Sequence, residues 1–139
     1  MKIFKYLPIL ALCVLALNLS SCQDDDDIYD NLLSGIWVGD LGFNYGPDPV
    51  SSELYFMNDG RGIDKQYYFD DPVNVPPVAE LKFNWDIRYG VLTLDYLPSR
   101  GTTYPLLEIR GVYINRNELT GTLYIDGRSD GSIRLVRRY

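Results

Sequence analysis

The sequence predicts an all-β protein that folds as an antiparallel up-and-down barrel of about eight strands. Three observations predict it. From residue 33 onward the apolar runs are short, and turn residues follow each of them. Within the runs apolar and polar residues alternate, as in a strand with one buried face. Tyr, Val, Ile, Phe, Trp and Thr dominate the runs, which favours pleated sheet. A sandwich of two sheets is the alternative that the same pattern allows.

The N-terminal residues before this domain have the pattern of an export signal. The first five residues carry two lysines, residues 7–17 are apolar, and two serines precede Cys22. The apolar run is shorter than the about twenty residues that a membrane-spanning helix needs, so we expect a signal peptide over residues 1–21 rather than a membrane anchor helix. The segment LSSC at residues 19–22 resembles a bacterial lipobox. The resemblance implies cleavage before Cys22 and diacylation of its thiol.

A block of aspartates, Asp24–Asp27, follows the cysteine. Adjacent carboxylates repel each other and stay solvated, so residues 22–32 are predicted to be a flexible acidic tether. An acidic cluster directly after a lipidated cysteine also resembles the export signal of surface lipoproteins in the Bacteroidota. That resemblance implies a lipid-anchored protein of the outer membrane, exposed at the cell surface.

Charge and composition exclude several classes of function. Loss of residues 1–21 removes two of the 13 basic side chains, and the remaining 11 against 19 acidic ones give a formal charge of −8. Such a chain repels phosphate backbones, so nucleic acid is not an expected partner. The chain has no histidine, and its two cysteines are Cys13, in the signal, and Cys22. We therefore expect no metal site, no cofactor and no enzymatic activity.

Turn residues divide the predicted domain, residues 33–139, into strands. The first strand opens at residues 33–37 (LSGIW), and the only helix candidate, Ile28–Leu33, precedes it. Three hairpins follow, each with turn residues at its centre. Their strands are SSELYFM and IDKQYYF, then ELKFNWDIR and VLTLDYL, then LLEIRGVYI and ELTGTLYI. A turn over residues 127–131 leads to the last strand, residues 132–139.

The first and last strands carry a second resemblance. Gly35-Ile36-Trp37 resembles the first-strand signature of lipocalins and other calycin barrels, most closely small lipocalin-like lipoproteins of the Bacteroidota. In those barrels the Trp plugs the closed end and an Arg from the last strand covers it. Ile133, Leu135 and Arg137 share one parity, so Arg137 is predicted to cover Trp37. The resemblance covers most of residues 33–139 and implies ligand binding, although other lipocalin motifs are not visible.

Carboxylates are the best enzymatic candidates that remain. Asp86 and Asp95 could form the carboxylate pair of a glycoside hydrolase. Both alternate with apolar residues, however, and are most simply the solvated face of two strands. Asp70-Asp71 precedes a proline and is typical of a turn.

Two classes of binding function stay open. In the first, a small apolar or amphipathic ligand lies inside the barrel, in contact with Phe83, Trp85 and Tyr96. In the second, the protein meets a glycan or another protein through loops that carry tyrosine, of which the chain has 12 against five phenylalanines. Tyrosine is also simply a good strand residue. An eight-stranded barrel is only just wide enough to be filled by its own side chains, which slightly favours the second class. The lipocalin resemblance implies the first. We therefore predict a non-catalytic, surface-anchored lipoprotein that binds a small ligand, with the surface module as the alternative.

Overall fold

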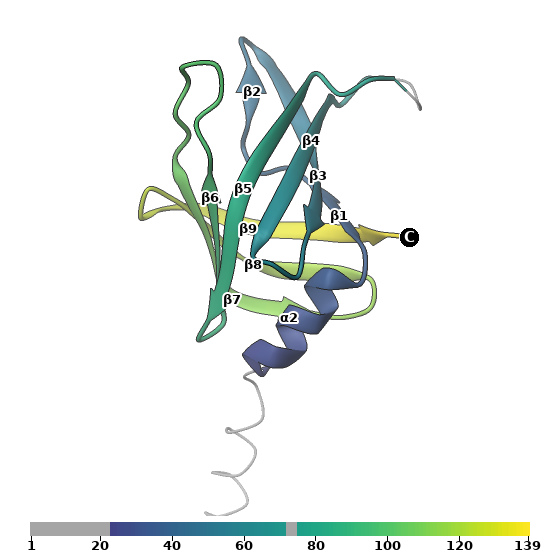
Figure 1. The fold of residues 1–139 in the computed structure, drawn as a ribbon, viewed down its shortest axis with the longest axis vertical. Coiled ribbons are helices and arrows are strands. Elements are labelled where there is room, and N and C mark those ends of the chain that lie inside the picture. The colour runs from purple at the N-terminus through teal and green to yellow at the C-terminus, as the bar shows by residue number, and fades with distance from the viewer. Residues whose placement is uncertain (1–22, 72–74) are drawn as a thin grey trace, which may run out of the picture.

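The computed structural model describes residues 23–71 and 75–139 (Figure 1). The predicted signal peptide, residues 1–21, and Cys22 lie outside the described residues. Within these described residues one helix, α2 (Asp25–Leu33), precedes nine strands. The strands are β1 (Ile36–Gly39), β2 (Asn44–Tyr45), β3 (Asp48–Phe56), β4 (Arg61–Tyr68), β5 (Ala79–Arg88), β6 (Val91–Tyr96), β7 (Leu106–Ile114), β8 (Glu118–Ile125) and β9 (Arg128–Arg138).

Eight of these strands close into an antiparallel barrel. From β3 to β9 each strand pairs with the next, β9 pairs with β1, and β1 pairs back with β3. The short strand β2 pairs with the N-terminal end of β3. The predicted barrel is therefore confirmed, and the alternative of two separate sheets is wrong. Closure removes the exposed sheet edges that an open sheet of this size would leave.

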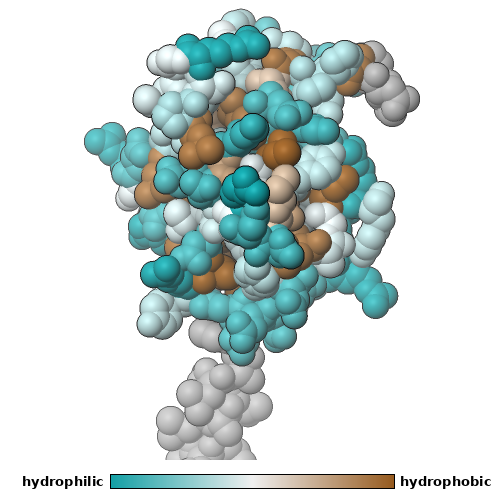
Figure 2. Space-filling view, in the orientation of Figure 1, coloured by the Kyte–Doolittle hydropathy of each residue, from teal (hydrophilic) through white to brown (hydrophobic). Residues whose placement is uncertain are grey.

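The alternation of apolar and polar residues in the sequence corresponds to the inner and outer faces of the barrel. Along β5 the side chains of Leu81, Phe83, Trp85 and Ile87 are buried, and the polar residues between them are exposed. Successive strand residues point to opposite faces, so one parity fills the interior and the other meets water. Figure 2 shows the result on one face, where small apolar patches are separated by hydrophilic side chains.

The prediction of a flexible acidic tether over residues 22–32 is wrong for the described part of that segment. Residues 25–33 form α2, which lies across one end of the barrel (Figure 1). Ile28 and Leu32, four positions apart and on one helix face, have no exposed surface. Asp25, Asp26 and Asp27 occupy the first turn, where negative charge favours the helix. The folded domain therefore begins by residue 23, ten residues before the predicted boundary.

Asp25 attaches this helix to the barrel. Its carboxylate accepts hydrogen bonds from the backbone N–H groups of Tyr89 and Gly90, at 2.6 and 2.7 Å, in the turn between β5 and β6. We expect Asp25→Ala to lower the free energy of unfolding by about 1–2 kcal/mol, because two charge-assisted hydrogen bonds are lost. Urea denaturation checks this.

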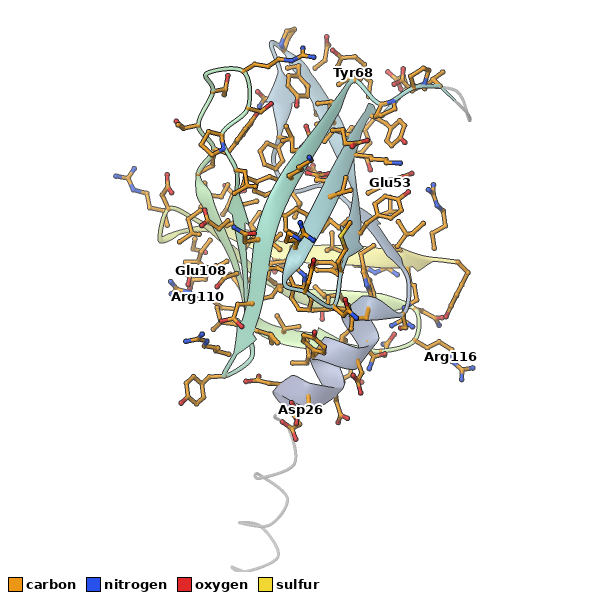
Figure 3. All side chains as sticks on the ribbon, viewed as in Figure 1. Asp26, Glu53, Tyr68, Glu108, Arg110 and Arg116 are labelled. Carbon is orange, nitrogen blue, oxygen red and sulfur yellow. The ribbon has the colours of Figure 1, made fainter. Side chains whose placement is uncertain are left out.

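Asp26→Ala is the matched control for that measurement. Asp26 lies in the same helical turn, is exposed, and points away from the barrel where the chain enters the domain (Figure 3). Its loss removes the same charge from the helix N-terminus and is expected to change stability by about 0.5 kcal/mol. Equal effects of the two substitutions would contradict the proposed role of Asp25.

The last hairpin is tighter than predicted. Its turn is Asp126-Gly127, and β9 begins at Arg128 rather than at residue 132. The register shifts between Leu123, which pairs with Gly131, and Tyr124, which pairs with Ser129, so that Asp130 is an extra residue in a β-bulge. Gly131 has φ of 105°, a conformation that glycine adopts readily. Gly131, which the sequence predicted to lie in a turn over residues 127–131, is part of the β-bulge.

Candidate functional site

The closed end of the barrel is built around Trp37. Its side chain has no exposed surface, and its indole N–H donates to the Leu32 carbonyl at 3.1 Å. The Arg137 guanidinium lies over the indole ring, 4.6 Å from its centre, and the two residues are Cα partners on β1 and β9. Arg137 also donates to the backbone and side-chain oxygens of Asn31 and to the Asn115 carbonyl. This arrangement joins α2, β1 and β9.

Above this plug, aromatic rings fill the interior. Phe56 meets Phe83 and Trp85 edge to face, with ring centres 5.6 and 5.2 Å apart, and Tyr29 of α2 lies 5.0 Å from Trp85. The Trp85 indole N–H donates to the backbone carbonyls of Met57 and Arg61, on either side of the turn between β3 and β4. Phe83 and Trp85, which the sequence suggested as ligand contacts, are only 1% and 6% exposed. The structure places both in the packed core.

Beyond the aromatic rings the interior becomes polar. Asp64 of β4 has no exposed surface, and one carboxylate oxygen, Oδ2, accepts three hydrogen bonds. The donors are Ser52 Oγ at 3.1 Å, Gln66 Nε2 at 2.8 Å and the Tyr96 hydroxyl at 2.9 Å. The other oxygen, Oδ1, is buried without a hydrogen-bond partner among the described residues. The Tyr45 hydroxyl donates to Gln66 Oε1 and connects this Asp64 cluster to β2.

Burial changes the acidity of these groups. Desolvation raises the pKa of the Asp64 carboxyl from 3.8 to about 6, although the hydrogen bonds from Gln66, Tyr96 and Ser52 lower it in part. Burial, and then the charge of Asp64, raise the pKa of the Tyr96 hydroxyl well above its usual value. Above pH 6 the interior therefore holds a carboxylate surrounded by neutral hydroxyl and amide donors.

A depression of about 450 Å³ opens at the end of the barrel opposite α2, which we call the mouth. Two of its lining side chains contact the Asp64 cluster. Tyr45 donates to Gln66, and the Tyr104 ring lies 6.1 Å from that of Tyr96. The lining mixes apolar and polar groups: Tyr45, Pro77, Val78, Ala79, Glu80, Leu81, Ser99, Arg100, Thr102 and Tyr104. The mouth is therefore a surface recess with a buried polar network beneath it.

Asp64 is not among the carboxylates that the sequence pattern indicated as candidates, Asp86 and Asp95. Asp86 and Asp95 are exposed on the outer wall, where Asp86 pairs with Arg88. Glu108 pairs in the same way with Arg110, also on the outer wall (Figure 3). Asp64 lies on the inward face of β4 with Gly62 and Gln66, each two positions away from it. Recognising it required knowing which parity faces inward.

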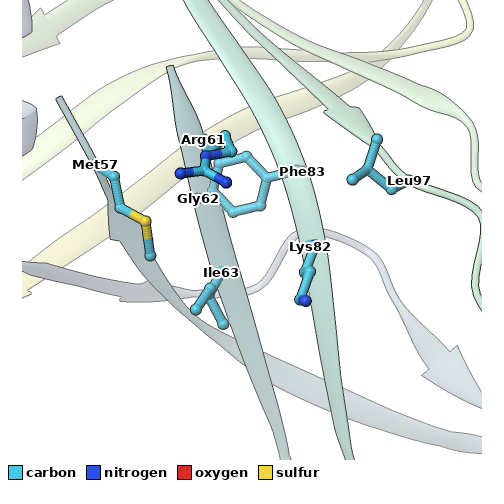
Figure 4. A pocket seen from close by; sticks show the side chains of 7 residues that line it. All are labelled: Met57, Arg61, Gly62, Ile63, Lys82, Phe83 and Leu97. Atoms are coloured by element: carbon cyan, nitrogen blue, oxygen red, sulfur yellow. The ribbon is translucent and has the colours of Figure 1, made fainter. Parts of the chain in front are cut away.

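A second recess, about 420 Å³, lies on the outer wall between β4 and β5 (Figure 4). Its lining is mostly apolar and includes Met57, Ile63, Leu97 and the stem of Lys82. Phe83 contributes only at its floor, where Gly62 has no side chain. It does not reach the Asp64 cluster, because the wall of the barrel separates the two.

Within residues 23–71 and 75–139 no group of three or more His, Cys, Asp or Glu side chains is arranged to hold a metal ion. None of the helices in this part of the chain is both long and apolar enough to cross a membrane. No protein-family model, curated protein or solved structure matches the chain.

Proposed function

We propose that the protein is a non-catalytic, lipid-anchored binding protein that holds a small amphipathic ligand at the barrel mouth. One observation carries the proposal: a recess of about 450 Å³ lies at the open end of an otherwise packed barrel. Small-molecule sites are typically concave, mainly apolar and supplied with a few polar groups that orient the ligand, within roughly 300–1,000 Å³. The mouth has this size, and its lining combines apolar side chains with at least as much polar surface.

The lining indicates the chemistry of the ligand. Leu81, Ala79 and the rings of Tyr45 and Tyr104 offer an apolar or aromatic part a place to pack. The Arg100 side chain on the rim offers a positive charge to a polar end group. Glu80 also lines the mouth, so a compact ring or short chain fits best with an anionic end directed to Arg100 and away from Glu80.

The filled interior argues against a ligand held deep in the barrel. Rings of Phe56, Phe83, Trp85 and Tyr29 contact one another there, and protein cores are packed too densely to admit a ligand among such side chains. Of the three predicted contacts, Tyr96 is the one that borders the mouth, through Tyr104. It would act on a ligand indirectly, by positioning the Asp64 cluster.

The anchoring part of the proposal comes from the N-terminal sequence. The LSSC segment ending at Cys22 and the aspartates after it support acylation of Cys22 and display at the outer membrane surface. We expect no catalytic turnover, because the chain lacks histidine and Asp64 is enclosed beneath Tyr45 and Gln66. The alternative of a surface module for a glycan or protein stays a prediction, and the filled interior is compatible with it.

An amphipathic fluorescent anion, 1-anilinonaphthalene-8-sulfonate, tests the mouth. We expect saturable binding to the wild type and about tenfold weaker binding to Arg100→Glu, because a reversed charge on the rim opposes the sulfonate by about 1.4 kcal/mol. Fluorescence titration at low ionic strength measures both dissociation constants.

Two controls locate the bound probe. Arg116→Glu makes the same charge change in the exposed turn between β7 and β8, near α2 and away from the mouth (Figure 3), and should leave the affinity unchanged. Met57→Glu places a charge in the outer recess between β4 and β5. If Met57→Glu abolishes binding and Arg100→Glu does not, the mouth is not the site. If the probe does not bind the wild type in a saturable manner, the small-ligand proposal fails.

A further inference from the structure

Two exposed tyrosines lie beside the point where the chain enters the domain. Tyr89, in the turn between β5 and β6, is 97% exposed, and Tyr113, on β7, is 56% exposed. Together with Gln23, Asp24 and Asp25 they line an open depression of about 590 Å³ at the α2 end of the barrel. Two largely exposed aromatic side chains that line one depression form a candidate contact surface.

Hydrogen bonds hold this part of the surface in place. The Gln23 side chain both donates to the Ile114 carbonyl and accepts from the Ile114 N–H, each at 2.9 Å. The Asp25 carboxylate binds the backbone of the turn that carries Tyr89. The Val112 N–H donates to the Gly90 carbonyl at 3.0 Å. Residue 23, the β5–β6 turn and the end of β7 are therefore fixed relative to one another.

The proposed anchor adjoins this surface directly. Cys22 is the residue before Gln23, and consecutive Cα atoms lie only about 3.8 Å apart. The polar headgroup region of a bilayer is about 5–8 Å thick on each side. No spacer separates the anchor from the domain, so an acylated Cys22 brings the α2 end of the barrel to the depth of the headgroups. Tyrosine is enriched at this depth, because its ring is apolar and its hydroxyl is polar.

We propose that Tyr89 and Tyr113 contact the headgroup region of the bilayer that anchors the protein and hold the barrel with its α2 end against the membrane. This inference rests on the proposed acylation of Cys22. It deepens the proposed function, because β2 and the β6–β7 loop at the mouth lie at the opposite end of the barrel and point into the medium (Figure 1). The mouth is thereby open to dissolved ligands and closed to lipids.

The acidic side chains limit how deep the contact goes. Asp24, Asp26, Asp27 and Asp30 are exposed around the same end of the barrel. Carboxylates stay in water and are repelled by anionic headgroups, whereas a zwitterionic surface tolerates them. We therefore expect the tyrosines to reach the headgroups of phosphatidylcholine without insertion of α2 into the hydrocarbon.

Spin labels measure the orientation. The mature protein has no cysteine other than the acylated Cys22, so Tyr89→Cys and Tyr113→Cys each provide a single free thiol. Arg100→Cys at the mouth is the matched control. The labelled, lipidated proteins are placed in phosphatidylcholine nanodiscs, and the collision rates of each label with oxygen and with a water-soluble nickel chelate are compared. We expect the label at residue 89 or 113 to be at least fivefold less accessible to the chelate than the label at residue 100.

The outcomes separate this inference from the anchor on which it rests. If the wild-type protein neither takes up a palmitate analogue nor floats with phosphatidylcholine vesicles, both the anchor and the inference fail. If it floats, and Cys22→Ala does not, the anchor stands. In that case the spin labels decide the orientation. If the labels at residues 89 and 113 are as accessible to the chelate as the label at residue 100, the inference is overturned while the anchor still stands. Circular dichroism of each variant verifies that the barrel is folded.

Discussion

Replacement of Trp37 by alanine is expected to lower the free energy of unfolding by about 3–5 kcal/mol. The Trp37 side chain is fully buried at the closed end of the barrel, and its loss leaves a cavity between α2, β1 and β9. It also removes the ring over which the Arg137 guanidinium lies. Single domains are stable by only about 5–15 kcal/mol, so this substitution removes a large share of the total.

Urea denaturation, followed by the fluorescence of the remaining Trp85, measures this effect. Arg137→Met is the companion variant, because methionine keeps an apolar stem beside the indole and removes the charge. A double-mutant cycle of the two substitutions should give a coupling of about 0.5–2 kcal/mol for the cation–π contact. A loss below about 1 kcal/mol for Trp37→Ala would show that the plug does not stabilise the barrel.

Substitution of Asp64 by asparagine is expected to change how stability depends on pH. In the folded protein burial raises the pKa of the Asp64 carboxyl to about 6, above its ordinary value of 3.8. The folded state therefore binds the proton more tightly than the unfolded state between these values. Stability falls as the pH rises through this window and is constant above it. From pH 4 to pH 7.5 the ionisation of Asp64 costs about 2 kcal/mol.

Asp64→Asn removes this titration and keeps an oxygen that accepts from Ser52, Gln66 and Tyr96. The free energy of unfolding of the wild type should therefore fall by about 2 kcal/mol relative to that of the variant between pH 4 and pH 7.5. Asp95→Asn, on the exposed outer wall, is the control and should show a pH-independent difference. A constant difference for Asp64→Asn would mean that the carboxyl is solvated in the folded protein.

Much of the barrel was predictable from local pattern. The strands from β5 to β8 begin and end within a residue of their predicted limits. Alternation of apolar and polar residues and turn residues such as Tyr89-Gly90 are local signals, and hairpins pair neighbours in sequence. The alternation along β9 was equally informative. It predicted that Arg137 lies on the same face of the strand as Leu135 and Ile133.

The candidate site was much less predictable. Phe83 and Trp85 were expected at a ligand and lie in the core, while Asp64, the buried carboxyl, was not singled out. A polar residue within an alternating strand is normally assigned to the wet face. Nothing within β4 alone distinguishes Asp64 from Lys65, and only the pairing of β4 with β3 and β5 decides which of them is enclosed.

The sequence by itself therefore determined the strands, their hairpins and the barrel class, because these depend on residues close together in the chain. The tertiary structure alone decided the role of the aspartates after Cys22. Asp25 binds the backbone of Tyr89, 64 positions later, and Ile28 and Leu32 become helical where the barrel end offers them an apolar surface. A short acidic segment is not helical in isolation, because nucleation costs more than its few hydrogen bonds return. Packing against the closed barrel supplies the difference. The helix candidate Ile28–Leu33 was readable from the sequence, but the start of α2 at Asp25 and its contact with the barrel were not.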